Sequence, residues 1–449
     1  MMTRAVERFT EFDARLTGYW QDKKLVGPEA DRTDVLTSIV LGLAPLFVLT
    51  VRGWTNIAFV LLLILSLVGL HRRFKSYWSL RADKRIMWLS LALAFPFIGI
   101  LLSQLIRHDI QPSYYDGPLR PLAGILLLFH LSARRINFVR IFQWTCPLAV
   151  LFSGIAVWLN PAPTAFWGGR WATYFVDPLT FGQYALLLGF ISLLTIHLVE
   201  RDSPAAVALK ISAFLVGLVL SVGSASRSSW AAIPALIVLW FALVVRDRRL
   251  ITAGFTGAVA AIVAAYMFVD IVHLRIDAAV NDYVAYFSGG NRDSPAGLRL
   301  SLARVAWELF LMNPLQGYGD HGFPPLQPIE AIAPFFTPQL EYALHHNGAH
   351  NEILQNMIRS GIFGLIRSLL MFVVPFVIFL SAARARSTVT SSAAAVGLSY
   401  ITAVFFFGMS TETFNLKFVF TFYTIMICAL SAQVIWSAPA HAAVKIEAT

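Results

Sequence analysis

Apolar runs long enough to cross a lipid bilayer recur along this chain from residue 35 to residue 437. A bilayer core about 30 Å thick takes roughly 20 apolar residues in a helix, whose backbone groups are then hydrogen-bonded internally. With 57% hydrophobic and only 13% charged residues, the chain is too apolar for a soluble globular protein. The sequence predicts an all-α polytopic membrane protein with about twelve transmembrane helices, at residues 35–51, 54–71, 86–106, 119–133, 141–159, 178–198, 207–223, 229–245, 250–272, 358–382, 390–410 and 418–437.

Basic residues between these runs predict how the helices are oriented. If the N-terminus is cytoplasmic, 16 Lys and Arg residues fall in inner turns and six in the short outer turns. Inner loops of membrane proteins carry an excess of positive charge, so this distribution predicts an even number of spans with both termini in the cytoplasm. Membrane topology then explains the net charge of +10, and we expect no nucleic-acid partner.

The predicted spans divide the chain into five parts: a cytoplasmic N-terminal segment (1–34), nine transmembrane helices (35–272), a large outer loop (273–357), three more helices (358–437) and a cytoplasmic tail (438–449). The first segment is either an interfacial amphipathic helix or a solvated tail, because apolar residues recur in it at helical spacing at Val6, Phe9, Phe12, Leu16 and Tyr19. A loop as long as 273–357 is typical of a functional segment. Within it, residues 297–312 have helical apolar spacing, and Asn313-Pro314 should end that helix.

Basic residues on the outer side are candidates for function, because they run against the inside bias. The candidates are Arg170 and Arg227 in outer turns, and Arg292, Arg299 and Arg304 in the long outer loop. Arg227 is the most informative, since the tight turn Ser224–Trp230 should hold it near the membrane surface. Arginines of this kind can instead extend to lipid phosphates, and that is our interpretation of Arg52, Arg107 and Arg120.

Histidines are concentrated in the same loop, as His321, His345, His346 and His350. His346 and His350 are four residues apart and could share one helix face. No Asp-x-Asp or His-Glu-x-x-His pattern occurs in the outer segments, so we expect neither a metal nor another cofactor. If the tenth helix starts near Asn347, its positive end would favour neutral His350, the form that a general base needs. A structural capping role for His350 is the alternative.

Several motifs carry a resemblance to one family. His350-Asn351, followed after nine residues by Gly361-Ile362-Phe363-Gly364, resembles the signature of bacterial O-antigen ligases. The same superfamily also contains O-antigen polymerases and protein O-oligosaccharyltransferases. Segments similar to it are Ser224–Trp230, the run from Gly297-Leu298-Arg299 through Trp307 to Asn313-Pro314-Leu315-Gln316-Gly317-Tyr318-Gly319, and, more weakly, Gly169-Arg170 to Asp177-Pro178. Ser228 and Ser229 depart from the family, whose members commonly have glycine shortly after the Ser-Arg pair.

The resemblance implies a glycosyltransferase of GT-C-like architecture in the bacterial inner membrane, with a periplasmic active site. Its donor would be a glycan on undecaprenyl pyrophosphate, its acceptor the lipid A-core oligosaccharide, and the lipid bilayer its surroundings. His350 would be the catalytic base, and Arg227, Arg299 and Arg170 would bind the pyrophosphate. The supporting residues would be His346, Asn351, Gly361 and Gly364.

Two alternatives to a ligase stay open. O-antigen polymerases and protein O-oligosaccharyltransferases share the donor, the topology and the arginine and histidine motifs. Twelve spans with both ends inside are also the plan of many secondary transporters, and Arg367 within the tenth span favours that class. The chain shows no repeated halves, however, and its candidate residues lie at the outer face.

Overall fold

The computed structural model describes residues 14–72, 77, 79–243, 248–320 and 322–438, and within these ranges the regular structure is entirely helical. A helix lies at each predicted span. These helices are α2 (Arg32–Leu46), α3 (Trp54–Arg72), α5 (Lys84–Arg107), α6 (Asp116–Ala133), α7 (Phe138–Leu159), α9 (Pro178–Leu194), α10 (Pro204–Gly223), α11 (Arg227–Leu243), α12 (Arg248–Phe268), α16 (Glu352–Ala382), α17 (Thr388–Gly408) and α18 (Lys417–Ser437).

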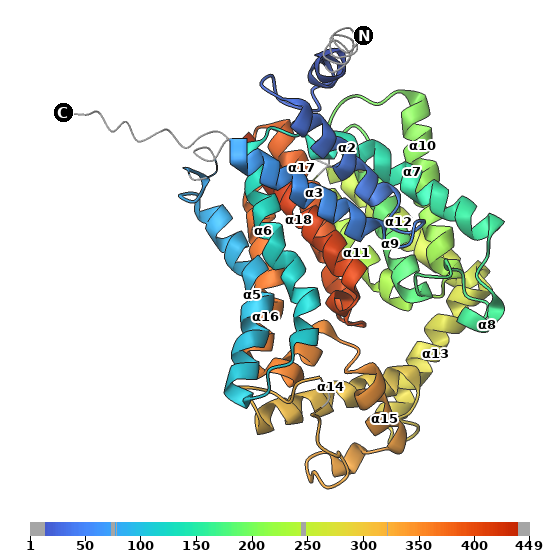
Figure 1. Cartoon of the computed structure of the whole chain (residues 1–449). Coiled ribbons are helices and arrows are strands. Elements are labelled where there is room, and N and C mark those ends of the chain that lie inside the picture. Colours follow the sequence, from blue (N-terminus) through green and yellow to red (C-terminus); the bar gives the residue numbers. More distant parts are fainter. Residues whose placement is uncertain (1–13, 73–76, 78, 244–247, 321, 439–449) are drawn as a thin grey trace.

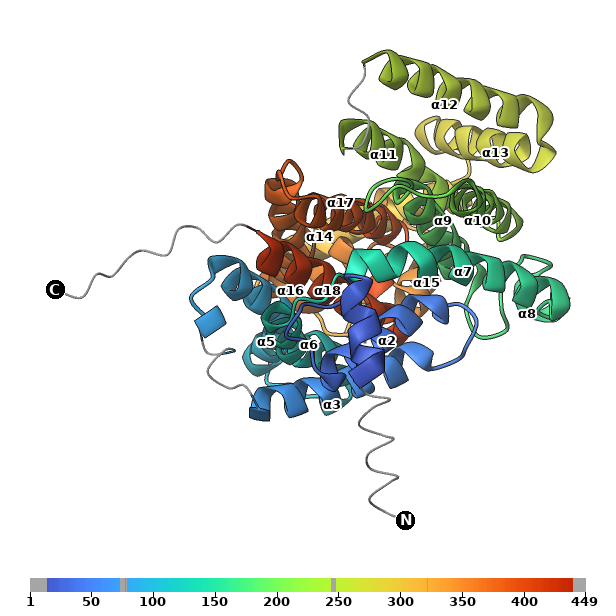
Figure 2. The same ribbon diagram turned by 90° about the horizontal axis from the view of Figure 1, so that it is seen from above.

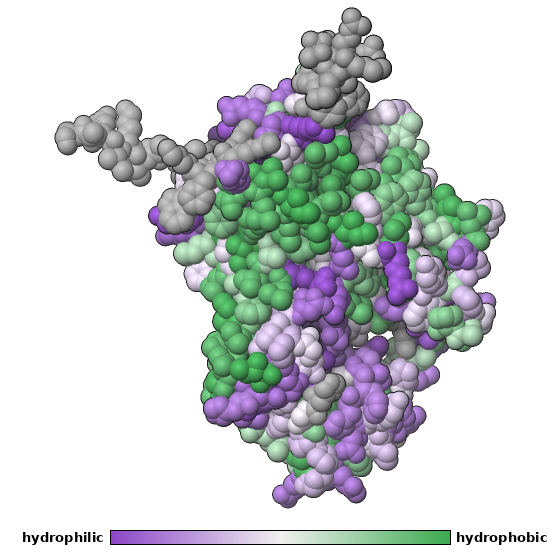
Figure 3. All heavy atoms as spheres, in the orientation of Figure 1, coloured by the Kyte–Doolittle hydropathy of each residue, from purple (hydrophilic) through white to green (hydrophobic). Residues whose placement is uncertain are grey.

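Seven of the described helices are long and apolar enough to cross a membrane, namely α3, α5, α7, α10, α16, α17 and α18. Two shorter apolar helices, Pro178–Leu194 and Ser228–Leu243, stand beside them. Figure 3 shows a broad apolar surface over the middle of the molecule, with polar residues gathered toward both of its ends. The prediction of an all-α polytopic membrane protein is therefore confirmed.

The connection between α12 and α16 is folded. It contains α13 (Asp270–Phe287), α14 (Pro295–Met312) and α15 (Pro338–Asn347), which gather at one end of the molecule (Figure 1), here named the loop end. As predicted, α14 spans the apolar repeat and ends at the C-cap Asn313. Apolar residues of this region form a hydrophobic core of their own, separate from that of the helical bundle, around Leu302, Leu309, Leu326, Leu340 and Ile358.

The core of the bundle is built around α18, which packs against α3, α6 and α17 and is buried along most of its length. Seen from above, α5, α6, α16 and α18 lie together, whereas α12 and α13 lie side by side at the edge of the molecule (Figure 2). Short helices complete the fold: η1 (Pro112–Tyr115), α8 (Thr164–Trp167), η2 (Ala333–Phe335) and η3 (Thr413–Asn415).

The N-terminal amphipathic prediction is only partly covered by the structure. Residues 14–22 are helical and include Leu16 and Tyr19. Val6, Phe9 and Phe12 lie outside the described residues, as does the predicted tail beyond residue 438.

Helix α16 is broken in its first third. Ser360 has φ −132° and ψ 17°, and Gly361 has φ +58° and ψ −138°, so a short helix over residues 352–359 is followed by a long one over 362–382. A break frees backbone groups that must find partners elsewhere when water is excluded. The segment that supplies those partners contributes Gly319 to the lining of a polar cavity.

Candidate functional site

The segment Asn313–Gly319 docks on the break in α16. The amide of Ile362 donates to the carbonyl oxygen of Pro314 at 2.7 Å, and the amides of Tyr318 and Gly319 donate to the carbonyls of Ile358 and Arg359 at 2.8 and 2.9 Å. These bonds satisfy the groups that the break leaves without helical partners. Two motifs 40 residues apart in the sequence are thus one structural unit.

The glycines of the histidine signature make this docking possible. Gly361 adopts a left-handed φ, and a Cβ atom there would lie 2.5 Å from the carbonyl oxygens of Pro314 and Leu315. At Gly364 a Cβ atom would lie 1.8 Å from the carbonyl oxygen of Asn356. A side chain at Gly361 would push the segment Asn313–Gly319 away from α16, and one at Gly364 would push apart the two parts of α16 on either side of the break. Both glycines therefore support the site by letting backbones approach closely.

His350 lies in a turn between two helices, and two details of the prediction were wrong. Helix α15 ends at Asn347, and the tenth predicted span begins at Glu352 rather than near Asn347. His350 therefore precedes that helix, with a left-handed φ of +48°, and shares no helix face with His346. Gly348, with φ +72°, interrupts the helical path between the two histidines.

His346 has a different environment. Its ring is exposed and stacks on Tyr342, with 4.0 Å between ring centroids, and its Nδ1 lies 2.9 Å from the carbonyl oxygen of Tyr342. His350, in contrast, is partly buried. Beside it, the Asn351 side chain caps the helix by accepting hydrogen bonds from the amides of Ile353 and Leu354 at 3.0 and 3.1 Å.

The electrostatics of the turn favour neutral His350. Burial is the main cause that lowers the imidazole pKa below its usual 6.5, and the positive charge of Arg299 lowers it further. In the described part of the chain the ring has no hydrogen-bond partner. A partly buried, neutral imidazole beside a guanidinium can accept a proton from a bound hydroxyl group.

Arginines from three segments line a cavity of about 230 Å³, here named the arginine pocket. Arg170 precedes α9, Arg275 lies on α13 and Arg299 lies on α14; the other lining residues are Leu179, Ala225 and Ser228. The structure therefore brings together Arg170 and Arg299, two of the three arginines singled out from the sequence. The third, Arg227, begins α11 directly beside this lining, and its side chain lies outside the described part of the structure.

Arg275 was missed by the sequence reasoning. It makes no hydrogen bond to any residue that the structure describes, so its guanidinium group is available to a ligand. The signal was present, because Arg275 follows the end of the ninth predicted span by only three residues, on the predicted outer side. Like Arg170, Arg275 is a basic residue on the predicted outer side, against the excess of basic residues in the inner turns.

Arg170 also holds the turn that precedes α11. Its Nε donates to the carbonyl oxygen of Ser224 at 2.7 Å, and the amide of Trp171 donates to the carbonyl of Gly223 at 3.0 Å. The turn needs such support because Ala225 has a left-handed φ of +52°. The weak motif around Arg170 and the Ser-Arg motif are thus neighbours in space.

The two serines that depart from the family pattern are bonded within this turn. The Gln183 amide donates to the Ser228 hydroxyl at 2.8 Å. The hydroxyls of Ser221 and Ser229 are 2.7 Å apart. Both serines are buried, and their hydrogen bonds fix the first turn of α11 against α9 and α10.

A second polar cavity, of about 130 Å³, lies among α5, α16 and the α17–α18 connection. Within it Arg359 forms ion pairs with Asp320 at 2.7 Å and with Glu412 at 2.9 Å. Burial raises the pKa of Glu412 to about 7, against the opposing effect of Arg359. None of these residues was a sequence candidate, because long-range pairing assembles the cluster.

Most of the other basic candidates contact neighbouring groups of the protein itself. Arg107 donates to the carbonyl oxygen of Gln316 at 2.9 Å, and Arg120 donates to Asn56 at 2.7 Å, so the interpretation that they extend to lipid was wrong. Arg52 is exposed. Arg292 donates to the carbonyl of Pro334, and Arg304 lies over the ring of Phe335.

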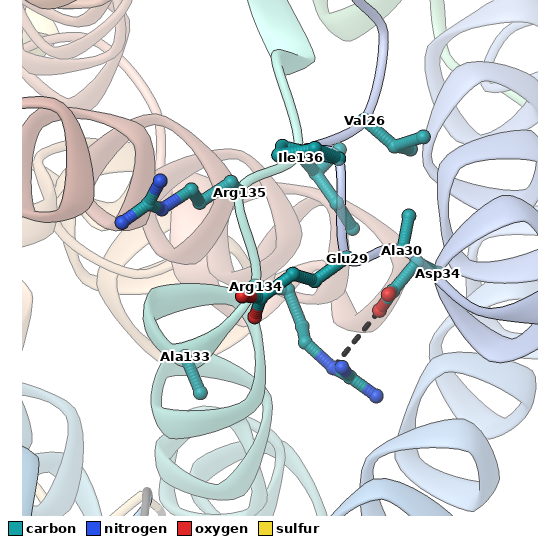
Figure 4. A pocket seen from close by; sticks show the side chains of 10 residues that line it. Val26, Glu29, Ala30, Asp34, Ala133, Arg134, Arg135 and Ile136 are labelled. Atoms are coloured by element: carbon teal, nitrogen blue, oxygen red, sulfur yellow. Dashed lines mark ion pairs between the residues drawn. The ribbon is translucent and has the colours of Figure 1, made fainter. Parts of the chain in front are cut away.

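A third cavity lies at the opposite end of the bundle from the loop end. It is lined by the segment 26–30 and by residues 133–136, and Arg134 forms an ion pair with Asp34 at 2.9 Å beside it (Figure 4). A further ion pair joins Arg134 to Asp31 at 3.1 Å. These bonds fasten the start of α2 to the end of α6, far from His350.

Comparison with known proteins gives two results. The family described as O-Antigen ligase matches residues 211–369. An uncharacterized protein of Haemophilus influenzae is 22% identical over 405 residues, covering 88% of this chain and 98% of the relative. The matched segment 211–369 contains Arg227, Arg275, Arg299 and His350 together with the break in α16. Over residues 211–369 the chain is therefore similar to the family described as O-Antigen ligase, in agreement with the motifs singled out from the sequence.

Proposed function

We propose that this protein transfers an O-antigen glycan from undecaprenyl pyrophosphate to the lipid A-core oligosaccharide, at the periplasmic face of the bacterial inner membrane. One observation carries the proposal: Arg299 both lines the arginine pocket and lowers the pKa of His350. An anion site and a neutral base are therefore neighbours, as a transfer from a pyrophosphate requires.

In this mechanism the arginine pocket binds the donor pyrophosphate. Guanidinium groups form forked hydrogen bonds with phosphate oxygens, and they stabilise the negative charge that develops as the glycosidic bond breaks. Arg170, Arg275 and Arg299 supply this charge. We assign the same role to Arg227, because it begins α11 between the lining residues Ala225 and Ser228. The reaction requires no metal, because fixed cations perform the neutralisation.

His350 activates the acceptor. Its imidazole takes the proton of an acceptor hydroxyl while the hydroxyl oxygen bonds to the anomeric carbon and the pyrophosphate leaves with the bonding electrons. A positioned base of this kind contributes roughly 10² to 10⁴-fold to the rate. Attack opposite the leaving group inverts the anomeric configuration in one displacement. NMR of the product linkage tests this, since retention of the donor's configuration would exclude a single displacement.

The orientation of the chain is part of the same proposal. The start of α2 and the end of α18 lie at the end of the bundle opposite to α14 and α15 (Figure 1), which supports an orientation with both on one side of the membrane. Cytoplasmic termini then place residues 273–357 and the arginine pocket in the periplasm. Cysteine accessibility at the exposed Asn291 position, against the exposed Arg201 position, tests the assignment.

A deletion strain separates the possible reactions. A ligase is indicated if lipopolysaccharide gels show complete loss of long chains while polymer accumulates on the carrier lipid. Capping by a single repeat would indicate a polymerase, and unchanged lipopolysaccharide with loss of protein glycosylation would indicate a protein O-oligosaccharyltransferase. Unchanged glycans together with solute uptake in proteoliposomes would support the transporter alternative.

A further inference from the structure

The second polar cavity contains a buried arginine, Arg367, that forms no ion pair or hydrogen bond with a described residue, although the negative charge of Glu352 acts on it. Arg367 is only 9% exposed, and its Nε has no hydrogen-bond partner. The guanidinium carbon lies over the ring of Phe420, 6.0 Å from the ring centroid, in a cation–π contact. Buried charges in proteins are paired or hydrogen-bonded, so this guanidinium group indicates a ligand that occupies the cavity.

The other charged groups of this cavity are already engaged. Arg359 is paired with Asp320 and Glu412. Lys417 is paired with Asp116. Glu352 accepts hydrogen bonds from the side chain of Asn356 at 2.7 Å and from the amide of Phe414 at 3.0 Å.

Arg107 adds a second cation without a carboxylate partner. Its NH1 donates to the carbonyl oxygens of Gln316 and Arg359 at 2.9 and 3.3 Å. The lining thus holds four cationic side chains against three acidic ones, which are Arg107, Arg359, Arg367, Lys417, Asp320, Glu352 and Glu412. Lys417 is offset by Asp116 outside the lining. Among the described residues, the guanidinium groups of Arg107 and Arg367 form no ion pair, and these two groups favour an anionic ligand over a neutral one.

The cavity adjoins the His350 turn. The amide of Ala349 donates to the Gln355 side chain at 2.6 Å, and a Cβ atom at Gly348 would lie 1.8 Å from Glu412 Oε1. Gln355 and Glu412 line this cavity, whereas Arg299, which acts on His350, lines the arginine pocket. The two cavities share no lining residue, and each is linked to the turn that carries the proposed base.

We propose that the second polar cavity binds a phosphate or carboxylate group of the acceptor glycolipid, with Arg367 as its principal ligand. The inference rests on the proposed function, because it assigns the acceptor to this side of His350 and the donor pyrophosphate to the arginine pocket. A volume of about 130 Å³ equals that of about four water molecules in the liquid, which suits one such group rather than an oligosaccharide.

The test compares acceptor use by the purified wild type, Arg367→Gln and the matched control Arg304→Gln. We expect Arg367→Gln to raise the KM for intact lipid A-core at least tenfold and to leave the KM for the donor unchanged. Arg304→Gln should match the wild type, because that side chain lies over Phe335 in the loop. Equal KM values for Arg367→Gln and the wild type would overturn the proposal.

Chemically altered acceptors identify the group that is bound. One of the two altered acceptors, dephosphorylated or carboxyl-reduced, should be used by the wild type as poorly as Arg367→Gln uses the intact acceptor. The variant should use the intact acceptor and that altered acceptor equally well. If inorganic phosphate binds the wild type while both altered acceptors are used normally, the cavity is a site for free phosphate and the acceptor assignment is wrong.

Binding measured without donor separates this inference from the proposed function. Labelled lipid A-core should bind the wild type more tightly than Arg367→Gln, whether or not transfer occurs. If the wild type transfers no glycan to any acceptor, the proposed function fails first. Arg367→Lys, which keeps the charge, should fold and recover part of the acceptor affinity. If it folds but binds acceptor no better than Arg367→Gln, charge recognition is refuted.

Discussion

Replacing Arg275 by alanine should weaken use of the lipid-linked donor while leaving the fold intact. Its side chain lines the arginine pocket with Arg170 and Arg299 and makes no hydrogen bond within the described structure. Its removal therefore costs a ligand contact rather than a structural one. A hydrogen bond to a charged group contributes about 1.5 to 3 kcal/mol. Since about 1.4 kcal/mol corresponds to a factor of ten, kcat/KM for the donor should fall by roughly 10 to 150-fold.

The assay is transfer between purified donor and acceptor in detergent, with the donor concentration varied. Arg292→Ala is the matched control, because it removes the same charge from the same loop, and its guanidinium group donates to the carbonyl of Pro334 rather than lining the arginine pocket. The control should keep its donor kcat/KM within about twofold of the wild type, since surface substitutions are nearly neutral. Equal effects of the two substitutions would refute a specific role for Arg275 in the pocket.

Three further predictions follow from the same geometry. Gly361→Ala should destabilise the protein by about 1 to 3 kcal/mol through its left-handed φ alone, which a lower melting temperature in detergent would show. The control Gly257→Ala should leave the melting temperature unchanged, because its added Cβ meets nothing within 4 Å. Because the pKa of Glu412 is about 7, its ion pair with Arg359 weakens as pH falls through that value, so wild-type activity should decline between pH 8 and 6. The pKa of His350 is lowered below 6.5, so titration of this base does not account for a decline that begins above pH 7. Glu412→Gln should therefore remove the decline in activity, and a variant with the wild-type pH profile would contradict this assignment. Arg299→Lys should lose most transfer activity, because an ammonium group cannot reproduce a forked contact, and full activity of this variant would show that point charge suffices.

The membrane explains why so much of the fold was predictable. Backbone groups in a bilayer must be satisfied within the helix, so apolar runs map onto helices with little ambiguity. The end of α14 at Asn313 was also predictable, because Pro314 follows it. The break in α16 was not, since Ser360-Gly361 lies inside the tenth predicted span without a proline beside it, and only docking of Pro314 and Leu315 reveals it.

The candidate site was predictable to the extent that its residues carried a local signal. Arg170 and Arg299 run against the charge bias of the predicted topology, and the structure places both in one pocket. Local sequence does not show that Arg359 meets Glu412, or that Arg107 meets Gln316, because each pair is far apart in the chain. The cause of the lowered pKa of His350 was also missed, since it comes from burial and Arg299 rather than from a helix end.

The central claim is that His350 is the base of a glycan transfer, and one measurement tests it most directly. Purified wild type, His350→Ala and His346→Ala are given lipid-linked glycan and lipid A-core, and both donor binding and product are quantified. The account predicts that His350→Ala binds donor normally but forms product at least 10²-fold more slowly, in the range expected for a lost base. His346→Ala, which loses only an exposed ring stacked on Tyr342, should keep most of its activity. Transfer by His350→Ala at the wild-type rate would contradict the account.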